Sequence, residues 1–285
     1  MVNFNGKIVL QDSNLFDQQN RGLRYGDALT EIIRVKNGKL IFWEDHYLKL
    51  MAAMRVLRME IPMNFTMEFL EAEILKLLSE QELNSRTILV DIFIFRNSST
   101  QKLLPEVSEV SYLLKGRNLA SSSFRIQNGG YEVELFKDFY LSADMLTTIN
   151  TTNKMLNVVG SVFANENGYQ DCLLLNHNKM VVGSLIGNLF LVKDNVVKTA
   201  PLTDGALNTV VRDQLIKIIQ GTEGYVFQEA SISPFELQKA DELFIINIES
   251  GIIPITKYRK KVYTADTANK IIEKLKGLIQ LQSII

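Results

Sequence analysis

The sequence of 285 residues contains one cysteine, Cys172, and only two histidines, His46 and His177. A single cysteine cannot form an intramolecular disulfide. Together these three residues are too few for the cysteine and histidine ligand set of a structural zinc site. The scarcity of cysteine favours a reducing cytoplasm as the location of the protein.

The sequence also lacks long apolar runs and an excess of charge of one sign. No stretch approaches the roughly 18 uninterrupted apolar residues of a membrane-spanning helix. Residues 1–14 contain no basic region followed by an apolar one. We therefore expect neither a recognisable secretion signal nor a membrane partner. The formal charge of -1 provides no overall field that would attract nucleic acid.

The composition is that of a globular protein, with 46% hydrophobic and 22% charged residues. The length predicts about two domains. Residues 115–130 form the least hydrophobic stretch and the one richest in Ser, Gly and Asn, so we place the domain boundary there. The prediction is a smaller α/β domain over 1–117, a linker over 118–121 and a larger domain over 122–285.

Hydrophobic periodicity predicts an α+β arrangement for the first 115 residues. The expected elements are a hairpin over 3–10, a loop over 11–22, strands over 29–35 and 39–43, a helix from Glu44 to Leu57, a helix over 65–81 with Asn64 as its N-cap, and strands over 87–96 and 110–114.

The same pattern predicts a second α+β region after residue 130. The expected elements are a strand over 131–139, a helix over 154–167, strands over 172–176, 180–182, 188–192 and 196–199, a helix over 209–220 that stops at Gly221, a strand over 243–247 and a helix over 264–280.

Three clusters contain residues suited to chemistry. Residues 21–27 (RGLRYGD) gather two Arg, two Gly, a Tyr and an Asp before a strand, and Lys154 follows Asn150-Thr151-Thr152-Asn153 at a helix start. Residues 202–209 lead into a helix whose free N-terminal amides would bind phosphate. Taken singly, each cluster has a plain alternative: a charged surface turn, a solvated lysine and an ordinary helix end.

The order and spacing of these clusters give the chain a resemblance to the class IV, or fold-type IV, pyridoxal-phosphate enzymes. That family includes branched-chain and D-amino acid aminotransferases and aminodeoxychorismate lyase. The resemblance covers nearly the whole chain. The matching segments are Asn5-Gly6, Arg21-Gly22, Tyr25-Gly26-Asp27, Glu31, Arg34, Asn37-Gly38-Lys39, Asp45-His46, Lys49-Leu50, Lys154 with Asn157, and residues 171–176, 187–192, 198–212 and 240–255.

The resemblance implies the two-domain α+β fold of D-amino acid aminotransferases and pyridoxal 5'-phosphate as cofactor. It implies that Lys154 forms the Schiff base with the cofactor aldehyde and later acts as the base at the substrate Cα. The lysine must be uncharged for both steps, and burial lowers a lysine pKa in that direction.

The resemblance also implies the remaining site residues and a partner. The substrate would be a small molecule with an amino group, and the protein a homodimer, because in this family loops of one subunit complete the neighbour's site. The cofactor phosphate would lie on the amides of Thr209, Val210 and Val211, with further contacts from Ser250 and Lys49, while Tyr25 and Glu31 would face the substrate.

The sequence departs from the family pattern in the cofactor site. Gly183 stands where the family has the glutamate that keeps the pyridine nitrogen protonated, and Lys49 replaces a phosphate-binding arginine. Val211 lies in a segment that lacks the family's glycine and phosphate-bonding threonine. An aminotransferase and a lyase that releases pyruvate and p-aminobenzoate both remain open, and the weaker electron sink favours the lyase. The alternative is a non-catalytic dimeric homologue that has lost or weakened cofactor binding.

Three other residues with reactive side chains have structural interpretations. We expect His46 to orient backbone at a helix start, His177 to lie in a turn, and Cys172 to be a small core residue.

Overall fold

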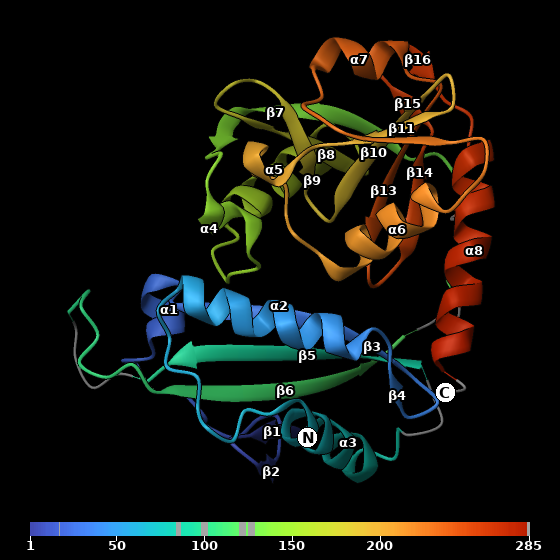
Figure 1. The fold of residues 1–285 in the computed structure, drawn as a ribbon. Helices are drawn as coiled ribbons and strands as arrows, with labels where there is room; N and C mark the ends of the chain where they lie inside the picture. The colour runs from blue at the N-terminus through green and yellow to red at the C-terminus, as the bar shows by residue number, and fades with distance from the viewer. Residues whose placement is uncertain (17, 84–86, 98–101, 120–123, 125–128, 284–285) are drawn as a thin grey trace. The chain divides into compact units, whose positions relative to one another are not determined.

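The protein is described by a computed structural model, which covers residues 1–283 except 17, 84–86, 98–101, 120–123 and 125–128. Contacts between Cα atoms divide the chain into two compact units (Figure 1). The first consists of Met1–Ser122, Asn150–Asn153 and Gln280–Ile285, and the second of Ser123–Ile149 and Lys154–Ile279. The linker predicted over 118–121 lies partly outside the described residues.

The first unit contains a six-stranded antiparallel sheet with the order β2-β1-β6-β5-β3-β4. Its longest strands are rich in β-branched and aromatic residues, as the sequence TILVDIFIFR of β5 illustrates. The elements of this unit are β1 (Val2–Phe4), β2 (Lys7–Val9), α1 (Arg21–Tyr25), β3 (Ala28–Lys36), β4 (Lys39–Leu40), α2 (Trp43–Val56), α3 (Met67–Glu80), β5 (Thr87–Arg96) and β6 (Val110–Asn118).

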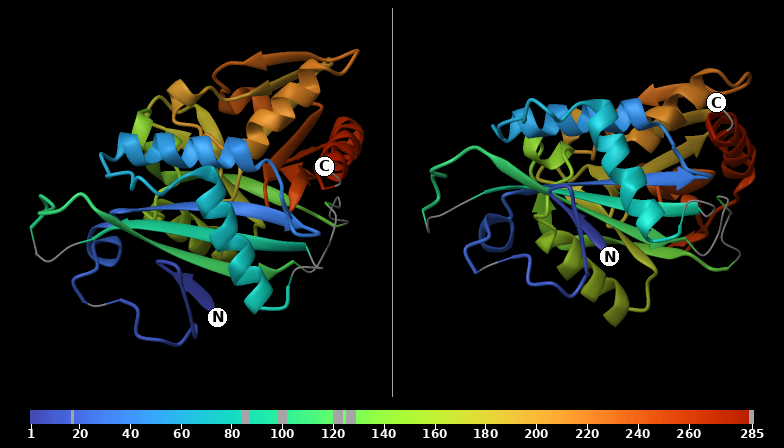
Figure 2. Two further views of the ribbon diagram at one scale, coloured as in Figure 1. Left: turned by 60° about the horizontal axis from the view of Figure 1, so that its bottom comes forward. Right: turned by 90° about the horizontal axis from the view of Figure 1, so that it is seen from below.

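Helices α2 and α3 lie on the same face of this sheet (Figure 2). Glu31 of β3 contacts His46 of α2, and Tyr112 of β6 packs against Phe69 of α3. The strand register places Glu31 and Tyr112 on one face, because Glu31 pairs across β5 with Leu114, two residues from Tyr112. The core of the first unit therefore lies between the sheet and these two helices.

The second unit contains two five-stranded sheets, with the orders β12-β11-β10-β13-β14 and β16-β15-β7-β8-β9. Its elements are β7 (Glu132–Leu141), α4 (Met145–Thr148), α5 (Met155–Glu166), β8 (Asp171–Asn176), β9 (Val181–Ser184), β10 (Asn188–Lys193), β11 (Val196–Thr199), the 3₁₀ turn Leu202–Asp204, α6 (Val210–Gln220), β12 (Val226–Glu229), α7 (Pro234–Lys239), β13 (Glu242–Asn247), β14 (Gly251–Ile255), β15 (Lys257–Tyr258), β16 (Lys261–Val262) and α8 (Asp266–Gln282).

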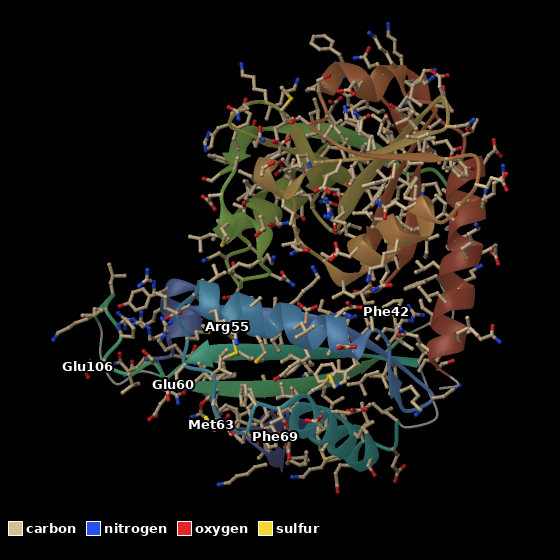
Figure 3. All side chains as sticks on the ribbon, viewed as in Figure 1. Phe42, Arg55, Glu60, Met63, Phe69 and Glu106 are labelled. Carbon is tan, nitrogen blue, oxygen red and sulfur yellow. The ribbon has the colours of Figure 1, made fainter. Side chains whose placement is uncertain are left out.

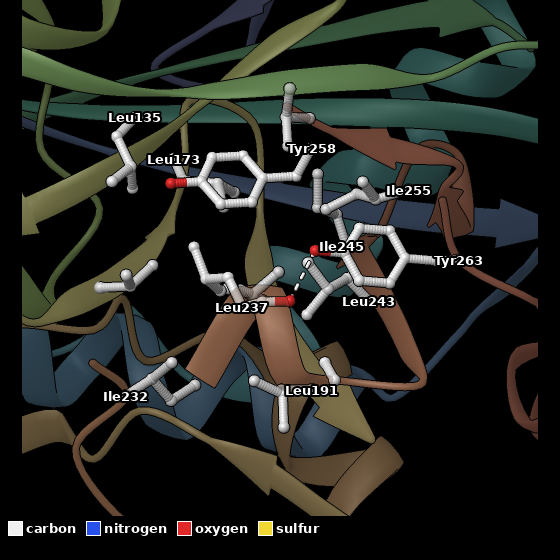
Figure 4. Close-up of a cluster of buried hydrophobic side chains, with 14 of the residues drawn as sticks. Leu135, Leu173, Leu191, Ile232, Leu237, Leu243, Ile245, Ile255, Tyr258 and Tyr263 are labelled. Atoms are coloured by element: carbon white, nitrogen blue, oxygen red, sulfur yellow. Dashed lines mark hydrogen bonds between the residues drawn. The ribbon is translucent and has the colours of Figure 1, made fainter. Parts of the chain in front are cut away.

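The main core of the second unit forms where the apolar faces of its two sheets meet (Figure 4). Leu173 from one sheet and Leu191 and Ile245 from the other belong to this cluster. Tyr263 fits into it because its hydroxyl donates a hydrogen bond of 2.6 Å to the Leu237 carbonyl. A second cluster, which includes the buried Cys172, lies between β7, β8, β9 and α5. The buried position of Cys172 agrees with its expected role as a core residue.

Two predicted boundaries in the first unit are wrong. The strand predicted over 39–43 ends at Leu40, because Phe42 (Figure 3) adopts a left-handed conformation with φ 57° and α2 begins at Trp43. Helix α3 is capped by Thr66, whose hydroxyl accepts the Phe69 amide, and not by Asn64. Asn64 instead lies in the preceding turn, where its carbonyl accepts the Thr66 amide.

Two further elements differ from the sequence-based expectation. Residues 21–25 form the short helix α1, where the sequence predicts the end of a loop before a strand. Strand β6 continues to Asn118 instead of ending at 114, because it pairs along its whole length with β5. Among the described residues, no helix has the length and apolar character needed to cross a membrane.

Candidate functional site

Lys154 is the residue immediately before helix α5, where it occupies the N-cap position. Its carbonyl accepts the Val158 amide, which closes the first turn of the helix. Burial lowers the pKa of the Lys154 ammonium group from its ordinary value. A larger fraction of this amine is therefore uncharged near neutral pH than for an exposed lysine, as a nucleophile or base requires.

The first turn of α5 is fixed to the β9–β10 connection. The side-chain amide of Asn157 donates a hydrogen bond of 2.7 Å to the Leu185 carbonyl. Gly160, one turn further, lies so close to the Leu185 side chain that a Cβ would overlap it. The Lys154 and Asn157 pair noticed in the sequence thus joins a candidate reactive amine to an anchor for its helix.

The N-terminus of helix α6 is organised by Asn188 and Thr209. The Thr209 hydroxyl accepts the Arg212 amide and donates a hydrogen bond of 2.7 Å to Asn188 Oδ1. Asn188 Nδ2 donates to the Leu207 carbonyl at 2.7 Å. The amides of Val210 and Val211 precede the capped amide of Arg212, so helix geometry leaves them without an intrahelical acceptor. Two adjacent amides at a helix start suit an anionic group such as a phosphate.

Ser250 lies in the turn between β13 and β14, where its amide donates to Asn247 Oδ1 at 2.7 Å. Asn188 pairs with Ile246 near the end of β13, so this turn and the Asn188–Thr209 contact occur at the same end of one sheet. The structure therefore brings Ser250 and the start of α6 to the same end of this sheet in the second unit.

Gly183 occupies β9 and carries no side chain that could reach a cofactor nitrogen. A Cβ built there would lie 3.1 Å from the Gly187 carbonyl oxygen, with no other close neighbour among the described residues. The backbone φ of Gly183 lies outside the left-handed region, so a larger residue meets a single tight contact at this position.

A buried acid that sequence reasoning did not single out lies near Gly183. Asp171 Oδ1 accepts the amides of Cys172 and Leu185, and its Oδ2 accepts the Tyr131 hydroxyl at 3.3 Å. Burial raises the pKa of Asp171 to about 6, against the opposing effect of hydrogen bonds that include Ser184. The sequence offers no clue to this, because an aspartate at a strand start usually lies in a turn.

In the first unit, residues 21–27 form a buried ion-pair network. Arg21 Nε lies 2.7 Å from Asp27 Oδ2, and Arg96 Nη1 lies 3.1 Å from the same oxygen. Arg21 also donates to the carbonyls of Lys102 and Leu103, at 2.7 and 2.6 Å. Its guanidinium carbon lies 4.9 Å from the centre of the Tyr25 ring. Arg21 and Asp27 are thus engaged with each other and with backbone.

Glu31 and Lys49 belong to a separate group in the first unit. Glu31 Oε1 lies 2.5 Å from His46 Nδ1, and both side chains are largely buried. His46 Nε2 is buried and has no hydrogen-bond partner within the described part of the chain. Lys49 follows His46 by three residues on α2, so both side chains lie on one side of that helix. The expectation that His46 orients backbone is wrong, because its ring binds the Glu31 carboxylate.

The structure therefore gathers the predicted site residues into two groups. Lys154, Thr209, Val210, Val211 and Ser250 belong to the second unit, and Tyr25, Glu31 and Lys49 to the first. Their assignment to a cofactor or a substrate stays a prediction. Asn157, Asn188 and Asp171 join them as residues that shape the second group.

Comparison with known proteins places this arrangement in a family. The sequence matches the family model described as amino-transferase class IV over residues 28–258. It is similar to the D-alanine aminotransferase of Listeria innocua, with 24% identity over 88% of this chain and 85% of that protein.

Solved structures share the fold of this chain. The branched-chain aminotransferase of Thermoproteus uzoniensis has a TM-score of 0.89 and 21% identity, with 99% of this chain and 95% of that chain covered. The 4-amino-4-deoxychorismate lyase of Pseudomonas aeruginosa has a TM-score of 0.83 and 21% identity, with 97% and 98% covered. A further branched-chain amino acid aminotransferase with this fold was solved with pyridoxamine 5'-phosphate. The expected architecture of fold-type IV enzymes is thereby confirmed.

Proposed function

Because the chain belongs to the amino-transferase class IV family of enzymes, we propose that it is a pyridoxal 5'-phosphate enzyme that acts on a small amino-group substrate through Lys154. The observation that carries this proposal is the state of Lys154. It is a lysine with a lowered pKa at the start of a helix, in the same unit as the α6 N-terminus.

The residues present fit the aldehyde and the phosphate of the cofactor, but no acidic residue is present at position 183 for its pyridine nitrogen. The Lys154 amine suits the cofactor aldehyde, and the amides of Val210 and Val211 suit its phosphate. The Thr209 amide donates to the Leu207 carbonyl at 3.1 Å and the Thr209 hydroxyl donates to Asn188 Oδ1, so in this proposal Thr209 supports the helix start and leaves the phosphate to the next two amides. No carboxylate occupies position 183 for the pyridine nitrogen.

The chain's own groups have defined tasks in this proposal. The cofactor, when bound, supplies an electron sink for charge that develops at the substrate Cα. Lys154 Nζ takes the proton from Cα, which its lowered pKa permits near neutral pH. The α6 amides hold the phosphate and so fix the position of the reacting atoms. We further propose that Lys49 contacts the phosphate and that Tyr25 and Glu31 face the substrate.

Between the two reactions of this family, we propose elimination, as in aminodeoxychorismate lyase, in preference to transamination. Elimination needs deprotonation and loss of a leaving group, whereas transamination also needs reprotonation at the cofactor. Elimination therefore demands less of the electron sink, and this sink is weakened by the absence of a carboxylate at Gly183. The same glycine supports the second candidate, a homologue that keeps the fold without catalysis.

Mixing the purified apoprotein with pyridoxal 5'-phosphate tests the proposal directly. After gel filtration has removed unbound cofactor, we expect absorbance between about 330 and 430 nm to remain with the protein, as a lysine-bound cofactor gives. Borohydride reduction followed by peptide mass spectrometry should place the adduct on Lys154. Lys154→Ala should abolish both signals, while Lys137→Ala, at an exposed lysine of β7, should keep them.

Turnover then separates the remaining candidates. Formation of p-aminobenzoate and pyruvate from aminodeoxychorismate would establish the lyase, and formation of a 2-oxo acid from an amino acid the aminotransferase. A protein that forms no adduct at any cofactor concentration refutes the enzyme proposal and leaves the non-catalytic homologue.

A homodimer and a cytoplasmic location also belong to this proposal. Helix α5 exposes an apolar stripe, with Met155, Val158 and Val162 at 74%, 55% and 52% exposure. Such a stripe supports burial against a second copy. Sedimentation should give twice the monomer mass of 32.4 kDa. Val158→Arg should shift it toward monomer, whereas Val226→Arg, at an exposed apolar residue of β12, should not. A wild-type monomer at micromolar concentration contradicts the proposal.

A further inference from the structure

The four residues before Lys154 are bound to strand β3 of the first unit. The Thr30 amide donates to the Asn150 carbonyl at 2.8 Å, and the Thr152 amide donates to the Ala28 carbonyl at 3.1 Å. Leu29 and Thr151 thereby form an isolated antiparallel bridge. We call residues 150–153 the strap. It takes the edge of β3 that β4 leaves open, because β4 pairs only with Val35 and Lys36.

The end of the strap rests on Gly26. This glycine has φ 65° and closes helix α1, with its amide donating to the carbonyls of Arg21 and Gly22. The Asn153 side chain occupies the space where a Cβ on residue 26 would stand, so any side chain there would overlap the Asn153 amide oxygen. Position 26 is thus glycine for two reasons, its backbone conformation and its contact with the strap.

The contact matters because Asn153 and Lys154 share a peptide bond. On its other side, Lys154 begins helix α5, whose first turn Asn157 fixes to Leu185. The backbone of Lys154 is therefore held from both directions, by the strap before it and by the helix after it. A lysine side chain has four rotatable bonds, so a fixed Cα restricts the positions that its amine reaches.

We propose that Gly26 and Asn153 are positioning residues, which act through the strap to fix the Lys154 amine where it reacts. The YGD segment then serves the site indirectly. Gly26 seats the strap, and Asp27 holds Arg21 and Arg96 around the end of β3. This inference rests on the proposed function of Lys154.

Four variants of the full-length protein test the proposal. Gly26→Ala should displace Asn153 and loosen the strap, and the double variant Gly26→Ala/Asn153→Gly should relieve the overlap. Asn153→Gly alone supplies the background for the double variant. Gly38→Ala is the matched control, because Gly38 has a similar φ of 74° in the first unit but no atom within 4 Å of its would-be Cβ.

Two measurements on the apoprotein report on the strap and on the amine without any cofactor. Hydrogen exchange of the Thr30 and Thr152 amides should accelerate about tenfold in Gly26→Ala. Trace acetylation of Lys154, followed by mass spectrometry across neutral and alkaline pH, gives the pKa of its amine. In Gly26→Ala this pKa should rise toward the ordinary lysine value, and the uncharged fraction of the amine near neutral pH should fall about tenfold.

The double variant and the control decide the outcome. Positioning is supported if the exchange rates and the uncharged fraction of Lys154 both return to within about twofold of wild type in the double variant while Gly38→Ala stays unchanged. Faster exchange with an unaltered Lys154 pKa overturns it, because the strap would then be structural only. Equal effects in Gly26→Ala and Gly38→Ala also overturn it, since general strain would explain them. A wild type that forms no adduct with pyridoxal 5'-phosphate defeats the proposed function, while these two measurements still decide the role of the strap.

Discussion

Replacement of Asp27 by alanine should strongly destabilise the first unit. Asp27 Oδ2 lies 2.7 Å from Arg21 Nε and 3.1 Å from Arg96 Nη1. All three side chains are at most 13% exposed, so water cannot replace the lost carboxylate well. Removal of one partner from a buried ion pair costs about 3–5 kcal/mol.

The structure also gives the size of the repulsion that remains. Because both nitrogen atoms touch one oxygen atom, they lie no more than about 6 Å apart, which corresponds to about 3 kcal/mol at an effective dielectric constant of about 20. We therefore expect Asp27→Ala to lower the free energy of unfolding by about 4 kcal/mol. Adding Arg96→Met should restore about 2 kcal/mol, because it removes the repulsion at the expense of the bond from Arg96 Nη2 to the Leu57 carbonyl.

Urea unfolding followed by tryptophan fluorescence is the suitable assay. Trp43 is the only tryptophan, it is 8% exposed, and it begins α2 in the first unit, so its emission reports on that unit alone. Asp91→Ala is the control, because its partner Arg117 is 34% exposed and the expected cost is below about 1 kcal/mol. The reasoning fails if Asp27→Ala costs no more than Asp91→Ala, or if Arg96→Met destabilises the Asp27→Ala protein further.

Two further predictions concern the second unit. Burial raises the pKa of Asp171 from 3.8 to about 6, so the folded protein binds this proton more tightly than the unfolded chain does. The resulting stabilisation of about 3 kcal/mol is complete below pH 3.8 and is lost as the pH rises through 6. Asp171→Asn should flatten this part of a stability-against-pH curve measured by urea unfolding, and an unchanged slope would contradict the assignment. Gly183→Glu should raise the ratio of transamination to elimination in product assays, because a carboxylate beside the cofactor nitrogen would keep that nitrogen protonated. An unaltered ratio in a variant that still binds cofactor would contradict this prediction.

Elements with local signals are predictable from the sequence. Strand β5 has the bounds that the sequence predicts, because its β-branched and aromatic residues are bounded by polar segments on both sides. Helix α6 lies within one residue of its predicted bounds, because Thr209 caps its start and Gly221 ends it. In both cases the determinants lie within a few residues of the boundary that they set.

Elements fixed by distant partners are not predictable in this way. The last residues of β6, including Gly116, have the composition of a loop and become strand because β5 supplies a partner for each of them. Phe42 takes a left-handed conformation that is rare for an aromatic residue, and no sequence pattern announces it. The strap likewise depends on pairing between Thr151 and Leu29, which are far apart in the sequence.

The candidate site shows the same division. Lys154 is identifiable from its place in a series of family motifs, and the structure adds a reason for its reactivity, since burial lowers its pKa. Charged residues beside glycines suggest a ligand site, but within residues 21–27 the charges of Arg21 and Asp27 neutralise each other. Only coordinates distinguish an arginine that binds a ligand from one that binds a neighbouring carboxylate.

These roles bear on whether the protein is a catalyst. Asn157 and Asn188 hold backbone segments in place, so a homologue that had lost catalysis would still need them in order to fold. Their presence supports the fold and not the reaction. Lys154 differs, because burial lowers the pKa of its amine, a property that catalysis uses and a scaffold does not need. If Lys154→Met stabilises the apoprotein in thermal unfolding while it abolishes the adduct, the lysine is retained for chemistry; if it destabilises the apoprotein, the amine has a structural role and the case for catalysis loses its main support.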